Sequence, residues 1–129
     1  MPPGASLPFA FVHVCGAHVW ISGHGPVDDA GRICGPFGKV GADLTPDQAY
    51  DAARRTALSI LADLKSAIGS LDRVGQWVRL FGMVNTAPGF SQMPAVINGA
   101  SDLINRLYGP EIGRHARSAI GVAELPWNI

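Results

Sequence analysis

One segment, residues 74–85, restricts the possible folds of this chain more than any other. Its sequence, VGQWVRLFGMVN, has the β-branched and aromatic residues that are typical of a strand. Both faces are apolar: Val78, Leu80 and Val84 alternate with Trp77, Phe81 and Met83. A sheet with helices on one side only normally shows a polar second face. We therefore expect another sheet or another subunit to cover the second face.

Two helices are expected, one on each side of this strand in the chain. Residues 45–68 begin with a T-x-x-Q capping box formed by Thr45 and Gln48, and Gly69 ends their apolar stripe. A second apolar stripe runs from about Pro94 to Tyr108, where a Gly-Pro pair stops it. Helices of this length can serve as crossovers between strands.

The remaining strands lie near the two ends of the chain. FAFVHV and HVWISG are separated by a hairpin-sized connection, and the last strand is expected from about His115 to Leu125. Between hairpin and first helix we expect a short strand and a flexible glycine loop. This order predicts an α+β fold, a two-layer α/β sandwich in which two helices cover one face of a mixed sheet. Residues 1–129 form a single domain, without a linker or repeat.

Charge and composition exclude several functional classes. The formal net charge is zero and no Lys/Arg cluster occurs, so no field attracts nucleic acid or an anionic membrane. No apolar run is long enough to span a bilayer, and the N-terminal sequence lacks the features of a signal peptide. Cys15 and Cys34 form no CxxC motif and are expected to be buried, inert thiols. A cytoplasmic location is predicted.

The last strand combines one cation with a row of small side chains. By alternation, one face carries His115, Arg117, Ala119, Gly121 and Ala123. The other face carries Ser118, Ile120 and Val122, which predicts that this second face packs in the core. Small neighbours leave space beside Arg117, whose guanidinium can bind a carboxylate or phosphate with two donors. Alternatively, Arg117 pairs with a structural Asp or Glu or extends to the rim, and the small residues allow close subunit approach. The sequence leaves both interpretations open.

Four motifs occur in a characteristic order along nearly the whole chain. They are WISGHGPVDDAGRI, LDRVGQWVRLFGMVNTAPGF, VINGASDLINRLYG, and ARSAIGVAELP preceded by GRH. Together they resemble the Rid family, also called YjgF or L-PSP endoribonuclease, and NGASDL and GRHARSA are most similar to its chorismate-mutase-like branch. The resemblance implies a homotrimer with helices outside, a β-barrel formed by the sheets inside, and three ligand clefts between subunits.

The resemblance also implies an activity and a set of substrate-binding residues. Members of the family hydrolyse reactive enamines and imines to 2-keto acids and ammonia, and the arginine that matches Arg117 holds the substrate carboxylate. Ala119 stands where deaminase members often have cysteine, and Phe9 stands where a tyrosine lines the pocket. Ser22 and Gly23, from the matching hairpin motif, are further candidates. The family's last strand, whose glutamate orients water, is expected to be missing from this sequence.

Because Phe9, Ala119 and the missing glutamate leave the cleft without the family's usual polar groups, other side chains would have to move the protons. His24 and His115 are the catalytic candidates, because histidine exchanges protons near neutral pH, although a structural role explains either one as well. Asn85 either lines the cleft or braces the turn that follows it. The four histidines lack metal-ligand spacing, so neither a metal nor another cofactor is predicted.

Two hypotheses about function follow. In the first, the chain is a Rid-like homotrimer whose clefts bind a small carboxylate metabolite and hydrolyse an enamine or imine. In the second, it is a metabolite-binding or interaction protein that retains Arg117 but has lost the catalytic groups around it. Ribonuclease activity is disfavoured, because the chain is neutral and has no basic, aromatic-rich surface.

Overall fold

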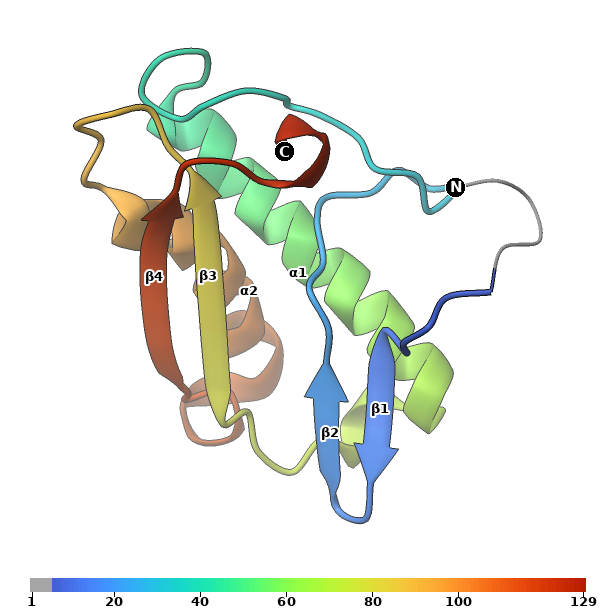
Figure 1. Ribbon diagram of the computed structural model, residues 1–129. Coiled ribbons are helices and arrows are strands. Elements are labelled where there is room, and N and C mark those ends of the chain that lie inside the picture. The colour runs from blue at the N-terminus through green and yellow to red at the C-terminus, as the bar shows by residue number, and fades with distance from the viewer. Residues whose placement is uncertain (1–5) are drawn as a thin grey trace.

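The computed structural model describes residues 6–129, which fold into two helices and four strands (Figure 1). In chain order they are β1 (Val12–Cys15), β2 (His18–Ile21), α1 (Pro46–Ile68), β3 (Arg79–Asn85), α2 (Met93–Ile112) and β4 (Ala116–Val122). β1 and β2 pair antiparallel, whereas β3 and β4 pair parallel with α2 as their crossover. The α+β class is confirmed, with the antiparallel and parallel pairs in two separate two-stranded sheets.

The first helix begins and ends where the sequence predicts. The Gln48 backbone N–H donates to Thr45 Oγ1 at 3.2 Å, and the Thr45 N–H donates to Gln48 Oε1 at 2.9 Å. These two bonds satisfy donors that the first helical turn cannot pair by itself. At the other end, Gly69 has a φ of 86° and its N–H donates to the Lys65 carbonyl at 2.8 Å. No helix within residues 6–129 is long and apolar enough to cross a membrane.

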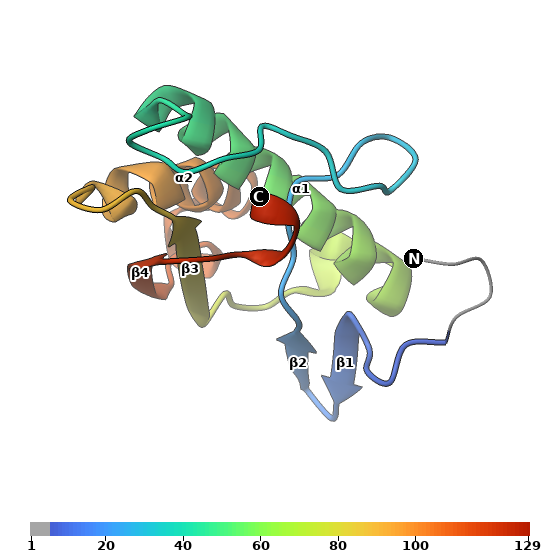
Figure 2. The same cartoon turned by 45° about the horizontal axis from the view of Figure 1, so that its top comes forward.

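The two helices form one layer, and β3 and β4 lie below it in a second layer (Figure 2). Two glycines allow the layers and helices to approach closely. A Cβ at Gly99 of α2 would overlap the Tyr50 carbonyl oxygen of α1, and a Cβ at Gly82 of β3 would lie 2.5 Å from Ile97 of α2. The hydrophobic core forms between the helices and the β3–β4 sheet. Its buried residues are Val40, Ala49, Val84, Val96 and Ile97.

The structure corrects the expected orientation of β4. The register pairs Leu80 with Arg117 and Gly82 with Ala119, so these four residues face the side of the sheet that α2 covers. Ala119 packs against the core, whereas Ile120, which was assigned to the core, is 39% exposed. The assignment was wrong because alternation separates two faces without showing which one meets the helices. The small residues near Ala119 make room for packing within the chain.

The opposite face of β3 and β4 carries exposed apolar side chains next to Arg79, whose guanidinium lies 5.6 Å from the centre of the Phe81 ring. Phe81 is 49% exposed, Met83 is 43% exposed and Ile120 lies beside them on the paired strand. These three residues form what we call the outer sheet face. Exposed apolar side chains grouped in this way mark a surface that contacts another molecule. Within β3, which begins at Arg79, the predicted alternation holds: Leu80 and Val84 face α2, whereas Phe81 and Met83 are exposed in residues 6–129. Before β3 the prediction was wrong, because Trp77 packs on Tyr108 of α2 and Val78 is 71% exposed.

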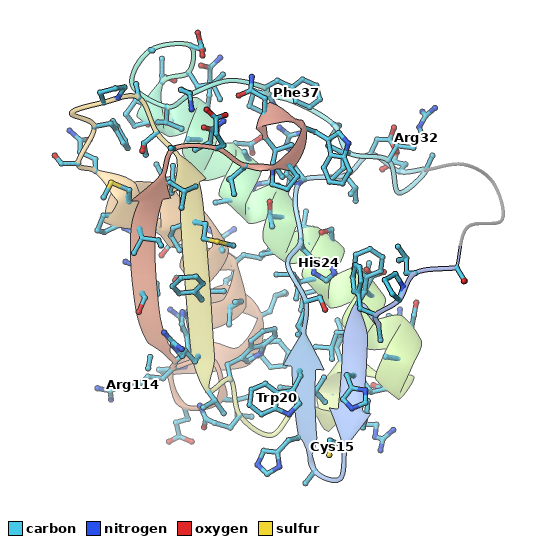
Figure 3. All side chains as sticks on the ribbon, in the orientation of Figure 1. Cys15, Trp20, His24, Arg32, Phe37 and Arg114 are labelled. Carbon is cyan, nitrogen blue, oxygen red and sulfur yellow. The ribbon has the colours of Figure 1, made fainter. Side chains whose placement is uncertain are left out.

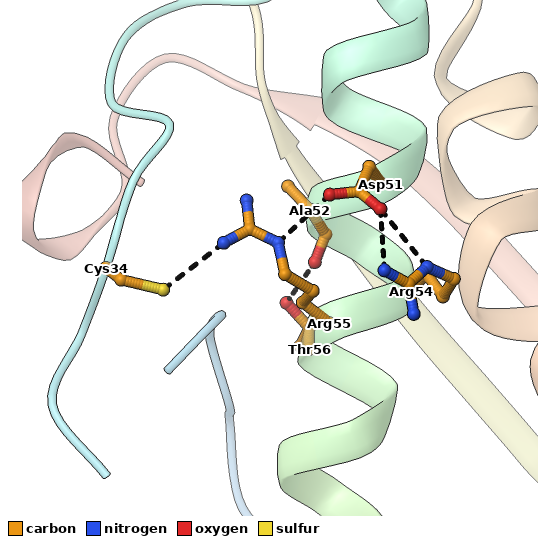
Figure 4. A network of polar contacts seen from close by, with 6 residues as sticks. All are labelled: Cys34, Asp51, Ala52, Arg54, Arg55 and Thr56. Atoms are coloured by element: carbon orange, nitrogen blue, oxygen red, sulfur yellow. Dashed lines mark hydrogen bonds and ion pairs between the residues drawn. The ribbon is translucent and has the colours of Figure 1, made fainter. Parts of the chain in front are cut away.

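The segment between β2 and α1 contains no regular strand. Val27 and Ile33 form only an isolated bridge, so the short strand expected here is reduced to one pair of residues. Cys34 in this segment lies 3.4 Å from the Arg55 guanidinium of α1, which ties the loop to the helix (Figure 4). Cys15 at the end of β1 is exposed, so the expectation that both thiols are buried was wrong.

Arg55 belongs to a small charged network on α1. Its Nε donates to Asp51 Oδ2 at 3.1 Å, while Arg54 Nη2 donates to Asp51 Oδ1 at 2.8 Å (Figure 4). The hydrogen bond from Arg54 lowers the pKa of the Asp51 carboxyl below its ordinary value of 3.8. The network holds the Arg55 guanidinium in the position from which it contacts Cys34 of the loop.

Gly99→Ala tests the contact between the helices. Alanine favours a helix over glycine by only about 1 kcal/mol, whereas the methyl group would overlap the Tyr50 carbonyl and push the helices apart. We expect a net loss of about 2 kcal/mol of unfolding free energy, measured by urea denaturation. Gly75→Ala is the matched control, because an added Cβ there meets nothing within 4 Å. Equal stability of the two variants would contradict the proposed close packing.

Candidate functional site

A groove of about 700 Å³ lies between α2 and the chain segment that leads into β4. The helix contributes Asn98, Ser101, Asp102 and Asn105, and the other side contributes Arg114, His115 and Arg117. We call this the α2–β4 groove. It brings together two of the residues singled out in the sequence, Arg117 and His115, because β4 runs past the helix that precedes it.

Arg117 is held in the groove by neutral groups. Its Nη1 donates to Asn98 Oδ1 at 2.8 Å and to Ser101 Oγ at 3.2 Å, and Nη2 lies 3.5 Å from the Pro94 carbonyl. Within residues 6–129, Arg117 forms no ion pair with a carboxylate at 4.0 Å or less. The alternative of a structural Asp or Glu partner is therefore wrong for the described chain. The guanidinium is positioned while its charge stays uncompensated.

Ser101 connects Arg117 to His115. The Nδ1 atom of His115 lies 2.7 Å from the Gly113 carbonyl oxygen, which can only accept, so Nδ1 carries a proton. In the neutral ring, Nε2 is then an acceptor for the Ser101 hydroxyl, 3.0 Å away. The hydroxyl oxygen in turn accepts from Arg117. A directed chain of hydrogen bonds thus presents a basic ring nitrogen next to the guanidinium.

One carboxylate lines the groove, and its partner is a tyrosine. The Tyr50 hydroxyl of α1 donates to Asp102 Oδ2 at 2.8 Å, and this hydrogen bond raises the pKa of Tyr50 above its ordinary value of 10.0. Asp102 forms no ion pair with Arg114 or Arg117 among the described residues. Two arginines and one carboxylate therefore line the groove, and this balance of charge favours an anionic ligand.

His24, the other catalytic candidate, lies in a separate place against α1 (Figure 3). Its side chain is only 4% exposed, with Nδ1 2.7 Å from the Ser22 carbonyl and Nε2 3.0 Å from Asp63 Oδ2. Each ring nitrogen thus lies within hydrogen-bond distance of an oxygen that can accept. The contact joins the end of β2 to α1, and in the single chain it is remote from the α2–β4 groove.

The remaining hairpin candidates lie near His24. The Ser22 hydroxyl donates to the Ala10 carbonyl at 2.7 Å, which closes the base of the hairpin. Gly23 has open space where a side chain would be, and Phe9 is exposed apart from an edge contact with Phe11 at 5.5 Å. Within one chain these residues are not brought to Arg117. Their role as substrate contacts stays a prediction, as does that of Ala119, which packs against the core.

Asn85 is buried at the end of β3 and braces three segments. It is 3% exposed, and its Nδ2 donates to the Gly38 carbonyl at 3.2 Å and to Asn128 Oδ1 at 2.9 Å. Its Oδ1 accepts from Lys39 Nζ at 3.0 Å, and the same ammonium donates to the Ala123 carbonyl. Of the two interpretations given above, these contacts favour the brace.

The polar side of α2 was not identified from the sequence. Asn98, Ser101, Asp102 and Asn105 recur at helical spacing in NGASDLIN, which places them on one side of the helix. The signal in the sequence is a stripe of small polar residues on this helix, followed by a strand that carries a cation. Within residues 6–129, no three His, Cys, Asp or Glu side chains are grouped closely enough to hold a metal ion.

Asn85→Ala tests the bracing role. The substitution leaves the Gly38 carbonyl, Asn128 and Lys39 without their partner in a buried place, and we expect a loss of about 2 kcal/mol in urea-induced unfolding. Asn105→Ala is the matched control, because this asparagine is exposed on a helix and its removal should cost little. An Asn85→Ala protein as stable as the wild type would favour the other interpretation, in which Asn85 lines the ligand cleft.

Comparison with known proteins places the chain in a family. Residues 5–129 match the family model described as "YjgF/chorismate mutase-like, putative endoribonuclease". Protein TCP17 of Trypanosoma cruzi is 44% identical over 116 residues, which cover 89% of this chain and 71% of that protein.

Two solved structures have the same fold. Atu1372 of Agrobacterium tumefaciens, described as having unknown function, superposes with a TM-score of 0.87 at 38% identity, over 97% of this chain and 79% of that one. An endoribonuclease of Shewanella oneidensis, described as "putative", superposes with a TM-score of 0.87 at 33% identity, over 96% of this chain and 80% of that one. The family match spans the whole described fold, including β4 and the groove beside it. The chain therefore belongs to the YjgF/chorismate mutase-like family.

Proposed function

We propose that the chain binds a small 2-imino or enamine carboxylate in the α2–β4 groove and hydrolyses it to a 2-keto acid and ammonia. The observation that carries this proposal is Arg117, a guanidinium fixed by an amide, a hydroxyl and a carbonyl, with no ion-pair partner among residues 6–129. Membership of the family supports a Rid-like fold, and the substrate class is our own inference.

Binding follows from the geometry of Arg117. The planar guanidinium has five N–H donors, and the contacts within the chain leave Nε and part of Nη2 for a ligand. A carboxylate matches two parallel donors, and a charge-assisted pair of this kind is stronger than a neutral hydrogen bond. Because Asn98 and Ser101 already hold the side chain, little rotamer freedom is lost when the ligand binds.

The hydrolysis needs one water molecule and two proton transfers to the imine nitrogen. The water oxygen attacks the imine carbon while His115 Nε2, directly or through the Ser101 hydroxyl, accepts the water proton. The protonated ring gives this proton to the nitrogen, which yields the carbinolamine. His115 Nε2 then accepts the proton of the new hydroxyl group and passes it to the amino nitrogen, so that the C–N bond breaks and ammonia leaves as the C=O bond forms. An enamine first takes a proton at its β-carbon to become the imine. Phe9 and Ala119 bring no titratable group, so His115 carries the acid–base role in this proposal.

A second candidate function is binding without catalysis. It is favoured by Ala119, whose methyl group packs against the core, and by Phe9, whose ring lacks a hydroxyl. In that case Arg117 still holds a carboxylate, but no group moves the proton. The two candidates therefore differ in turnover and agree in binding.

We also propose that the protein is a homotrimer. The support is the outer sheet face, whose Phe81, Met83 and Ile120 are exposed within residues 6–129. A cytoplasmic location, the absence of nucleic-acid binding and the absence of a cofactor all stay predictions from the sequence. The neutral net charge disfavours an endoribonuclease role for this chain.

The hydrolase proposal is tested with freshly generated 2-aminoacrylate, whose decay to pyruvate and ammonia is followed against buffer. We expect acceleration by the wild type, and a loss of about a hundredfold in His115→Gln with pyruvate binding retained. A wild type that binds pyruvate but does not accelerate the decay would establish the second candidate instead.

Arg117→Gln tests the carboxylate contact under both candidates. Loss of the cation should weaken pyruvate binding by about a hundredfold in calorimetric titrations, since a ligand charge would remain without its partner. Arg32→Gln is the matched control: it removes the same charge from an exposed turn. Binding that survives in Arg117→Gln would mean that the carboxylate is held elsewhere.

The oligomeric state is tested by sedimentation equilibrium. We expect a mass three times the 13.5 kDa of the chain. Phe81→Asp should lower it, because the substitution places a charge within the outer sheet face. Phe37→Asp, at a residue exposed to a similar degree in a loop (Figure 3), should leave the mass unchanged. A monomeric wild type would contradict the trimer.

A further inference from the structure

We propose that the α2–β4 groove selects a substrate with two carboxylates, a 2-imino dicarboxylate, and that Arg114 is the residue that recognises the second one. This inference rests on the proposed function and specifies its substrate class. It starts from a feature that the proposed reaction leaves unused: Arg114 lines the same groove as Arg117 and, among residues 6–129, forms no ion pair.

The two arginines lie beside different turns of α2. α2 runs antiparallel to β4, and Arg117 contacts Asn98 and Pro94 near the start of the helix. Arg114 precedes β4 and lies beside the other end of the helix. There the neighbouring Gly113 is packed so closely that an added Cβ would be 3.1 Å from Asn105 Oδ1. Figure 3 shows Arg114 at the outer edge of the molecule, next to the beginning of β4.

The length of the groove suits an extended dianion. Three residues separate Arg114 from Arg117 in the chain, which allows at most roughly 10 Å between their Cα atoms. On the helix side, the seven-residue step from Asn98 to Asn105 spans roughly 10 Å as well. Two long side chains that start this far apart can each hold one end of a ligand whose carboxylates are several bonds apart. A ligand with one carboxylate would leave the second guanidinium without a partner.

The other lining groups agree with this assignment. Between the cations, α2 offers the neutral Asn98, Ser101 and Asn105, which can hydrogen-bond a keto or imino group without repelling a negative charge. Asp102 is the one carboxylate that lines the groove, and one of its oxygens already accepts the hydrogen bond from Tyr50. Two cations against one engaged carboxylate leave a positive excess for the ligand.

The test compares two stable keto acids with the same carbon chain, 2-oxoglutarate and 2-oxopentanoate, at one fixed ionic strength. The full chain should bind 2-oxoglutarate about tenfold more tightly, because the second carboxylate gains a charge-assisted partner. Arg114→Gln should remove this preference and leave 2-oxopentanoate binding unchanged. Arg114→Lys should retain part of it, since the charge is kept without the planar donor pair.

Arg32→Gln is the charge-matched control and should keep the full preference. Equal affinity of the wild type for the two acids, or a preference that persists in Arg114→Gln, would overturn the dicarboxylate assignment while leaving the proposed function intact. A preference that is lost equally in Arg32→Gln would also overturn it, because the effect would then reflect net charge. If neither acid binds the wild type, the proposed function fails together with this inference.

Discussion

The packing of α2 between α1 and the β3–β4 pair is the contact on which the rest of this structure depends. Gly99 lets α2 approach the backbone of α1, and Gly82 lets Ile97 lie directly on β3. Burial of Val84, Val96 and Ile97 in this layer supplies the apolar area that stabilises it. The same approach brings the polar side of α2 to the beginning of β4. The groove is thus a consequence of helix packing and needs no loop of its own.

Arg117 illustrates how the fold turns a strand residue into a candidate binding group. On the helix-covered face it would normally meet an apolar side chain, and an unpaired charge there would be costly. It lies near the edge of that layer, where Asn98 and Ser101 satisfy its donors and the groove remains open to water. His115 takes part in the same network through Ser101. In the proposed hydrolysis, the guanidinium holds the substrate carboxylate and the ring nitrogen moves protons between water and the imine nitrogen.

Much of the fold followed from local signals. The capping box at Thr45, the glycine stop at Gly69 and the period of the apolar stripes predicted both helices, because these features act within a few residues. Arg117 and His115 could be chosen as candidates because charged and titratable side chains stand out in a strand. The mistaken core assignment of Ile120 and the overlooked polar residues of α2 had one cause. Neither the burial of Ile120 nor the role of the polar side of α2 can be predicted without knowing which side of the strand meets which side of the helix.

The sequence by itself determined the types of the main elements, the presence of a strand with two apolar faces and the identity of the one cation in the last strand. It could do so because propensity, capping and alternation are local properties. The tertiary structure decided which strand face α2 covers, that Arg117 has neutral partners, that Asn85 and His24 brace the chain, and that Arg114 shares the groove. Those outcomes depend on register and on helix packing. Both are fixed by contacts between residues that are distant in the chain, which a local pattern does not encode.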